Sequence, residues 1–310
     1  MASPSLARAG GETRRWLDVR PLARAIVQRQ SWFIAFIIFD ILVIHAIGSD
    51  SILRETWNYI QPGITVTIQI TIVAFLLAVL IGLVTAFGRI SRNIIIYNAS
   101  TLYVELFRGL PLLVIILIFA FVVTPGFVDW VSGGGDTAAQ AGAARIPFLD
   151  DLIQRLVGIP DERVATTTLR TRDIDPIWRI MFAFALTYGA FMSEVFRAGI
   201  ESIGRGQMEA SRSLGMTYFQ AMRYVILPQA VRNVLPALAN NFVFLLKDTS
   251  LASVVAVSEI SYLTRQYSSN RFRYPEGLLI LSFIYANLTI ILSMGAYYLE
   301  ARLQADRKEN

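Results

Sequence analysis

The stretch MEASRSLGMTYFQAMRYVILPQ (residues 208–229) is polar and basic, yet it lies between two strongly apolar segments. Gly215 follows Leu214 where a left-handed C-terminal helix cap would lie, a conformation that glycine adopts without steric cost. Thr217 and Gln220 have the spacing of a capping box, which predicts a second short helix, 217–225, at a new angle. The stretch therefore predicts two short helices joined at a fixed corner.

Leu227 and Pro228 mark the end of this stretch. The residue before a proline is disfavoured in helical conformation, and proline suits the first turn of a helix. We therefore expect the second short helix to close at Leu227 and a long helix to begin at Pro228. Taken alone, these local signals favour a simple connector, although a rigid protrusion is also what a mechanical contact with another protein requires.

The composition indicates a membrane protein. Of the 310 residues, 55% are hydrophobic and 16% charged, whereas soluble domains carry about 25% charged residues. The chain has no cysteine, which excludes disulfides and thiolate metal sites, and its single histidine, His45, argues against a histidine-rich one. In a membrane protein the net charge of +5 indicates cytoplasmic loops, so we expect membrane lipids and no nucleic acid as partners.

Six segments are long and apolar enough to be membrane-spanning helices. The first could also be the apolar core of a signal peptide, but Asp40 interrupts it and 31 residues precede it, so we expect a retained helix. The sequence thus predicts an all-α membrane protein with six spans: 32–48, 64–87, 109–126, 178–196, 228–247 and 277–299.

The arginines predict the orientation. Six of them precede the first span, which places the tail 1–31 in the cytoplasm. Alternation then places both termini and the loop 197–227 on the cytoplasmic side. The connection 127–177 becomes an outer insertion, in which the pattern of 147–160 predicts a short amphipathic helix.

Charged residues inside spans are candidates for function because burying them is costly. Glu105 and Arg108 precede a break at Gly109 and Pro111, where they could line a pathway, although an internal ion pair that fixes the bend is the simpler interpretation. Glu194 is a second candidate, for which a structural pair with Arg197 is again the simpler interpretation.

The span 228–247 is unusually polar. Asn233, Asn240 and Lys247 follow a spacing of seven, so they form one stripe that faces either other helices or a water-filled path. Lys247 could also extend to the membrane surface. With Asp248, Thr249 and Ser250 it offers donors for a carboxylate and acceptors for an ammonium group.

The sequence also resembles a known family. Glu209 and Ala210, then Gly215, then nine residues, then Val225-Ile226-Leu227-Pro228 resemble the EAA loop of binding-protein-dependent ABC importer permeases. Ser211 stands where that family prefers alanine. The segments 103–114, 192–203 and 227–251 are similar to those of its polar amino-acid permeases, so the resemblance covers roughly residues 60–300 without the insertion.

The resemblance implies a function and a site. It implies a permease domain at 60–303 with a five-helix core, to which 32–48 adds a helix, and a cytoplasmic tail at 304–310. It implies an importer of polar amino acids in the bacterial cytoplasmic (inner) membrane, and an EAA loop that couples it to a cytoplasmic ATPase through the residues Glu209, Ala210, Ser211, Gly215, Leu227 and Pro228.

The resemblance further implies partners: a dimer of ABC ATPases, a periplasmic or lipid-anchored solute-binding protein, and a second permease copy or a paralogue. The chain contains no G-x-x-x-x-G-K-[ST] motif. We therefore expect a non-catalytic subunit that binds no cofactor, with ATP and Mg²⁺ used by the partner ATPase. A self-sufficient secondary transporter or channel is the alternative, which the lack of repeat symmetry disfavours. A membrane enzyme is disfavoured by the scarcity of catalytic residue types.

Overall fold

The computed structural model describes residues 31–131 and 174–309, and within these ranges the chain is helical with no strand. The chain divides into two compact units, 1–55 and 56–310. In the first unit, the helix α2 (Ser31–Ser49) coincides with the predicted span 32–48. The carboxylate of Asp50 accepts a hydrogen bond from the N–H of Ile52 (2.7 Å) and so caps the start of α3 (Ser51–Ile60), which runs into the second unit.

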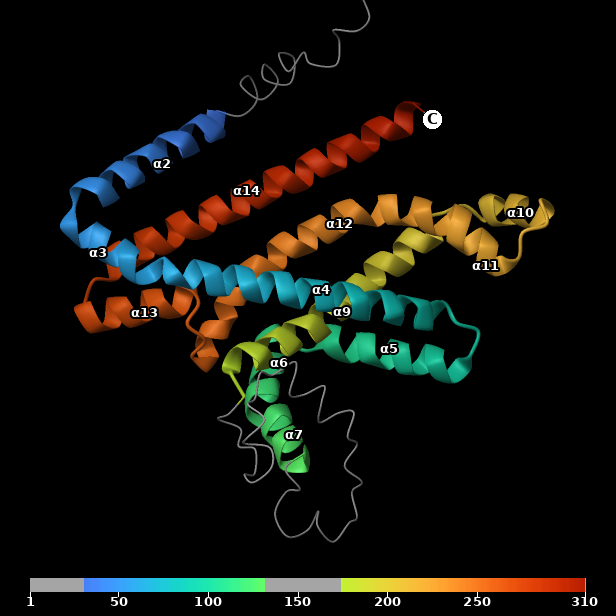
Figure 1. The fold of residues 1–310 in the computed structure, drawn as a ribbon, viewed down its shortest axis with the longest axis horizontal. Helices are drawn as coiled ribbons and strands as arrows, with labels where there is room; N and C mark the ends of the chain where they lie inside the picture. The colour runs from blue at the N-terminus through green and yellow to red at the C-terminus, as the bar shows by residue number, and fades with distance from the viewer. Residues whose placement is uncertain (1–30, 132–173, 310) are drawn as a thin grey trace, which may run out of the picture. The chain divides into compact units, whose positions relative to one another are not determined.

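The second unit contains the remaining elements in an antiparallel arrangement of long helices (Figure 1). In chain order they are α4 (Pro62–Ile90), α5 (Ile94–Gly109), α6 (Leu112–Ile118), the π-helical turn η2 (Phe119–Val123), α7 (Thr124–Val131), α9 (Pro176–Glu201), α10 (Arg205–Ser213), α11 (Tyr218–Ala221), the π-helical turn η5 (Met222–Ile226), α12 (Leu227–Asp248), the 3-10 helix η6 (Thr249–Val255), α13 (Ile260–Arg271) and α14 (Tyr274–Glu309).

Several helices have the length and composition of membrane spans. Among the described residues, Ser51–Ile90, Pro176–Glu201 and Tyr274–Tyr298 meet both criteria. The first two contain the predicted spans 64–87 and 178–196, and the third covers the predicted span 277–299 except its last residue. The predicted span 228–247 is present as the helix α12, but its polar side chains leave it outside this apolar set.

The break predicted at Gly109 and Pro111 is present, and it makes the span predicted at 109–126 begin at Leu112. The chain breaks at Leu110 and Pro111, and the helix α5 before the break makes an angle of 107° with the apolar segment Leu112–Val128 after it. Pro111, the N-cap residue of α6, explains the break, because it has no N–H to continue the hydrogen bonds of α5. The two segments together make a fourth span if they are counted as one.

The centre of the second unit is the pair α4 and α9 (Figure 1). Their backbones approach closely because small residues lie between them. A Cβ atom built on Gly82 would lie 2.8 Å from Cβ of Met192 and 2.9 Å from the carbonyl oxygen of Gly189. The hydroxyl of Tyr103 on α5 donates to the carbonyl of Leu186 on α9 (2.5 Å), which joins α5 to this pair.

Three predictions cannot be compared with this fold. The basic tail 1–30 and the amphipathic segment 147–160 lie outside the described residues, as does most of the insertion 127–177. Of that insertion, the structure describes residues 127–131 at the end of α7 and residues 174–177 at the start of α9.

Candidate functional site

The corner predicted at Gly215 is present. Gly215 has φ +83°, in the left-handed region. The N–H of Met216 donates to the carbonyl of Ser211 (3.1 Å) and the N–H of Gly215 to that of Arg212 (3.0 Å). These are the two hydrogen bonds of a Schellman motif, which ends α10 at this point. A Cβ on Gly215 would have no neighbour within 4 Å, so space is available for a side chain. Glycine is favoured here only because of the left-handed backbone conformation.

The second short helix starts as predicted. The N–H of Gln220 donates to the hydroxyl of Thr217 (3.3 Å), and the N–H of Thr217 donates to the side-chain oxygen of Gln220 (2.8 Å). This reciprocal pair is the capping box expected from the sequence. Between them, the Schellman motif and the capping box fix the angle between α10 and α11.

The end of this helix differs from the prediction. We expected it to close at Leu227, but α11 passes through η5 directly into α12, and Leu227 is helical with φ −58° and ψ −44°. Its N–H donates to the carbonyl of Met222, five residues back. The wider π-helical turn gives the ring of Pro228 room beside the preceding turn, so the proline continues the helix rather than breaking it.

The corner carries exposed apolar side chains that the sequence analysis did not single out. Leu214 is 80% exposed and Phe219 70%, with Tyr218 and Tyr224 beside them in the chain; these four residues are called the corner surface below. Glu209 and Ala210 on α10 are exposed, whereas Ser211 is buried and donates to the carbonyl of Gln207 (2.7 Å). The signal that could have revealed this surface is the presence of large apolar residues on both sides of a glycine corner.

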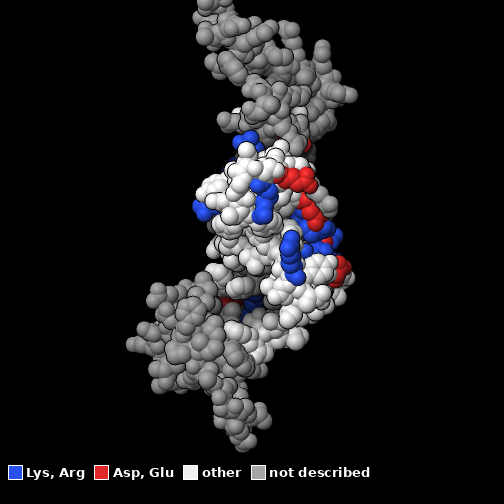
Figure 2. All heavy atoms as spheres, turned by 90° about the vertical axis from the view of Figure 1, so that its right-hand side faces the viewer, with Lys and Arg blue, Asp and Glu red and all other residues white. Residues whose placement is uncertain are grey.

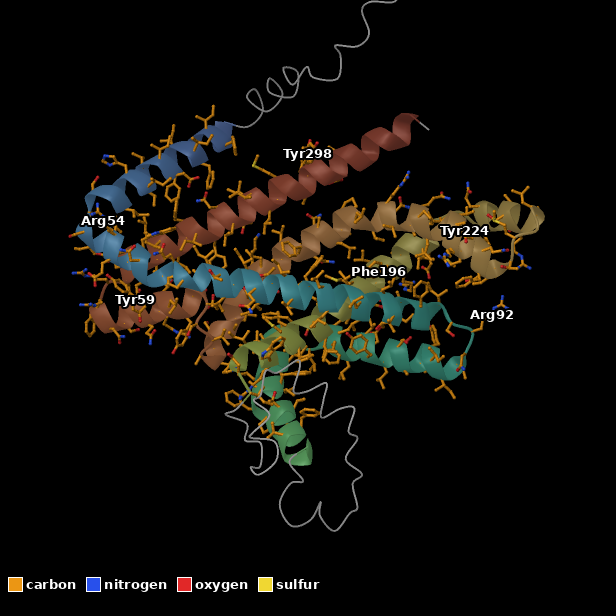
Figure 3. All side chains as sticks on the ribbon, viewed as in Figure 1. Arg54, Tyr59, Arg92, Phe196, Tyr224 and Tyr298 are labelled. Atoms are coloured by element: carbon orange, nitrogen blue, oxygen red, sulfur yellow. The ribbon has the colours of Figure 1, made fainter. Side chains whose placement is uncertain are left out.

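The corner surface lies at one end of the second unit. α10 and α11 are at this end and α13 is at the other (Figure 1), and the labelled residues Tyr224 and Arg92 lie at the same end as α10 (Figure 3). Figure 2 looks onto this end and shows acidic and basic side chains gathered next to one another toward one side, beside a broad uncharged area. Such a mixed surface with apolar anchors is typical of protein–protein contacts.

A cluster of charged residues joins α4, α5 and α9. Glu194 accepts hydrogen bonds from Arg89, from Arg108 (3.0 Å) and from Arg197 (2.8 Å). Arg197 also pairs with Glu201 (2.8 Å). The predicted pair of Glu194 and Arg197 is therefore present, within a larger network that will be called the arginine–glutamate cluster. Arg89 was not predicted to belong to this cluster, because only the fold places it beside α9.

The predicted pair of Glu105 and Arg108 is wrong. Arg108 instead turns toward α9, where it contacts Glu194 and lies 5.7 Å from the ring centre of Phe191. Glu105 is exposed and makes no ion pair with any residue that the structure describes. The physical reason is competition: Glu194 is less exposed than Glu105 and already collects two other arginines, which makes it the stronger partner.

The polar stripe of α12 opens onto two different cavities. The side-chain amide of Asn233 donates to the hydroxyl of Ser202 (2.9 Å) and lines a hollow of about 420 Å³ beside α10. Lys247 lines a cavity of about 610 Å³, on which Ser250 also lies. Asn240 is between them and exposed. The stripe thus extends along α12 from the hollow beside α10 to the cavity beside α13.

Asp248 and Thr249 do not line this larger cavity. The hydroxyl of Tyr188 on α9 donates to the carboxylate of Asp248 (2.7 Å), and Thr249 is buried and donates to the carbonyl of Leu246 (2.6 Å). Of the four residues Lys247–Ser250, the first and last line the cavity, while the middle two anchor the end of α12.

A buried carboxyl group, Glu259, was not predicted. It is fully buried at the start of α13, where its oxygens accept from the N–H groups of Ser261 (2.8 Å) and Tyr262 (2.7 Å). The hydroxyl of Tyr285 on α14 also donates to it (3.1 Å). Burial raises the pKa of Glu259 to about 7, although these hydrogen bonds lower it in part. Within the described residues, no cluster of acidic and histidine side chains could hold a metal ion.

The chain is similar in sequence to one large family of transport proteins. Residues 78–305 match the family described as "Binding-protein-dependent transport system inner membrane component". The L-cystine transport system permease protein TcyB of Bacillus subtilis is 31% identical over 83% of this chain and 92% of that protein. The glutamate/aspartate import permease protein GltK of Escherichia coli is 29% identical over 79% and 93%.

Solved structures give the same result for the fold. The chain matches a protein in the "Crystal structure of an amino acid ABC transporter with histidines" with a TM-score of 0.60 and 30% identity, over 81% of this chain and 97% of that one. It also matches an inward-facing structure of the MetNI methionine ABC transporter with a TM-score of 0.55 and 16% identity, over 79% and 95%. The fold of the second unit is therefore that of an ABC importer permease.

Proposed function

Because the chain belongs to the family of binding-protein-dependent transport system inner membrane components, we propose that it is the permease subunit of an ABC importer for polar amino acids. The names of its relatives support the substrate class, since they include permeases for L-cystine and for glutamate and aspartate. It conducts the substrate across the bacterial cytoplasmic membrane and performs no chemistry of its own.

The observation that carries this proposal is the rigid corner between α10 and α11. A Schellman motif and a capping box fix its angle, and α11 continues through η5 into α12 without an interruption. The corner surface offers large exposed apolar side chains, which are typical anchors of a protein interface. A movement imposed on the corner is therefore passed on to a long helix of the second unit.

We assign the coupling role to Glu209, Ala210, Ser211, Gly215, Leu227 and Pro228, with Leu214 and Phe219 added as apolar contacts. Gly215 sets the angle, Ser211 lets α10 pack closely, and Leu227 and Pro228 join the corner to α12. The surface they support docks on a cytoplasmic ATPase dimer, whose subunits bind ATP and Mg²⁺.

The remaining partners follow from the family. A periplasmic or lipid-anchored solute-binding protein delivers the substrate at the opposite end of the second unit, near α13, and a second permease copy or a paralogue completes the pathway. Four of the candidates remain assigned to the substrate pathway: Asn233, Asn240, Lys247 and Ser250. Glu105, Arg108 and Glu194 are reassigned, because Arg108 and Glu194 belong to the arginine–glutamate cluster and Glu105 is exposed outside it.

The proposal is tested by expressing the chain together with its neighbouring genes and purifying it under mild detergent. An ATPase should co-purify, and liposomes containing the complex should take up labelled amino acids only when ATP and the solute-binding protein are both present. Uptake by the chain alone, driven by an ion gradient, would instead establish a secondary transporter.

A further inference from the structure

The turn between α13 and α14 holds a phenylalanine in an unusual backbone conformation. Phe272 ends α13 with φ +56° and ψ +34°, in the left-handed region. A bulky residue in this region is an outlier, because its Cβ approaches the following carbonyl oxygen. The side chain is also 87% exposed, more than any other large apolar side chain of the described residues. Neither the backbone nor the burial of the ring therefore favours phenylalanine here for folding.

Hydrogen bonds and close packing hold this turn in place. The carbonyl of Ser268 accepts from the N–H of Phe272 and from the N–H of Arg273 (3.2 Å). Directly behind the turn, a Cβ built on Gly277 would clash with the hydroxyl of Ser268, so α13 and α14 approach one another closely. The exposure of the ring is therefore a property of a well-formed turn and not of a loose chain segment.

The surroundings of the ring are basic. Arg271 precedes Phe272 and Arg273 follows it. The segment 260–276 contains three arginines and a single acidic residue, Glu276, which is a formal excess of +2. The turn lies at the end of the second unit opposite the corner (Figure 1). An apolar anchor thus protrudes there from a positively charged surface.

A protein partner fits this turn better than a membrane surface does. A helix that lies on a membrane needs a broad apolar face. On α13 the apolar residues Ile260 and Tyr267 are buried, and the exposed residues are all polar. Phe272 is therefore an apolar side chain at the tip of a polar helix. A protein can bury such a ring in a pocket, and aromatic residues buried in this way dominate the affinity of many interfaces.

We propose that Phe272 is the anchor by which this chain binds its solute-binding protein, in an apolar pocket of that protein with carboxylates at its rim. The inference rests on the proposed function and adds to it the docking residue. The preformed turn presents the ring with little further loss of backbone entropy on binding. Arg271 and Arg273 favour a partner with an acidic surface and accelerate the encounter with it.

The test is an equilibrium titration of the permease–ATPase complex in nanodiscs with the solute-binding protein encoded beside this chain. Phe272→Gly removes the ring and at the same time relieves the backbone strain. Ala256→Gly is the matched control: Ala256 also has a positive φ (+61°) and is exposed, so this change relieves strain without removing a ring. Phe272→Trp keeps an aromatic anchor at the turn.

Binding and stability should respond separately. Phe272→Gly should weaken the binding of the solute-binding protein by about tenfold or more, as the loss of a hot spot does. Its melting temperature should stay close to that of the wild type, because the relief of strain offsets the greater freedom of glycine in the unfolded chain. Ala256→Gly and Phe272→Trp should both bind like the wild type.

Equal binding by Phe272→Gly and the wild type would overturn the inference, and so would a marked fall in the melting temperature of Phe272→Gly, which would make the ring a part of the fold. If Phe272→Gly binds more weakly only in nanodiscs with anionic lipid, and normally in those with neutral lipid, the ring acts on the membrane surface and the inference is wrong.

A Phe272→Gly complex that does not assemble is replaced by Phe272→Asn, because asparagine tolerates the left-handed region, and the same loss of binding is expected. The failure of the proposed function gives a different result. A wild-type complex that binds no solute-binding protein would contradict the assignment as an importer, whereas binding that ignores the residue at position 272 contradicts only the docking role.

Discussion

Gly215 shapes the corner through its backbone alone, and this makes its replacement informative. Valine at φ +83° costs on the order of 1–2 kcal/mol and favours a different exit angle for α11, although no neighbour would clash with its side chain. We expect Gly215→Val to reduce uptake at least tenfold while the permease stays in the membrane. Glu209→Ala should have the same effect more mildly.

The measurement is ATP hydrolysis and amino-acid uptake in parallel, on the complex in liposomes with and without the loaded solute-binding protein. Gly215→Asn is the matched control, because asparagine tolerates the left-handed region and should preserve coupling. Normal uptake by Gly215→Val would show that the corner is only a connector.

Glu259 predicts a dependence of stability on pH. Burial raises its pKa from 4.5 to about 7, so the folded protein favours the protonated carboxyl. The corresponding stabilisation is complete below pH 4.5 and is lost as the pH rises through about 7, with a magnitude on the order of 3 kcal/mol. The melting temperature in detergent should therefore fall between pH 4.5 and pH 7.

Glu259→Gln removes the titrating group and keeps an oxygen that can accept from Ser261 or Tyr262. Its melting temperature should change less over the same pH range than that of the wild type. Parallel curves for the two proteins would assign the pH dependence to another group.

At the scale of the elements, the contact between α4 and α9 depends on glycine. A Cβ at Gly82 would meet Cβ of Met192 at 2.8 Å and the backbone of Gly189 at 2.9 Å, so the helices must separate. We expect Gly82→Ala to destabilise the protein by about 1–3 kcal/mol, measured as a lower melting temperature in detergent. Gly295→Ala on α14 is the control, since its Cβ would have no neighbour within 4 Å, and equal losses would refute a packing origin.

The arginine–glutamate cluster makes a second prediction at this scale. The side chain of Glu194 is 23% exposed and pairs with three arginines from three helices, whereas that of Glu201 is 56% exposed and pairs with one. Glu194→Gln should therefore cost about 2 kcal/mol or more, and Glu201→Gln less than about 1 kcal/mol. Thermal unfolding of both variants checks this order, and a larger effect of Glu201→Gln would contradict it.

The individual elements show how much of the fold and of the candidate site could be predicted from the sequence. The capping box at Thr217 and the left-handed cap at Gly215 were predictable because each depends on residues within a few positions of one another. The partner of Arg108 and the cavity at Lys247 were not, because they depend on which helices are neighbours. Leu227 was misjudged since a π-helical turn, which has no reliable sequence signature, relieves the constraint that Pro228 imposes.

At the scale of the whole molecule, the arginines predict the orientation in the membrane. Six of them precede α2, so a reporter fused at residue 25 should be cytoplasmic and one fused at residue 140 should be external. Phosphatase and fluorescent-protein fusions measure this directly. An external signal at residue 25, or a mature chain that begins near residue 49, would contradict the predicted topology.

The uninterrupted path from α11 through η5 to α12 has a mechanical consequence. α12 has 22 residues and is therefore about 33 Å long, with the corner attached to one end and Lys247 near the other. α12 has Pro236 in its interior, where it can bend; when its two halves move together, a tilt of about 10° at the corner displaces the far end by about 6 Å. Such a displacement exceeds the reach of a hydrogen bond. An ATPase that moves the corner would thereby displace Lys247, and by thermodynamic reciprocity any contact that holds this end of α12 in place would resist the movement of the corner.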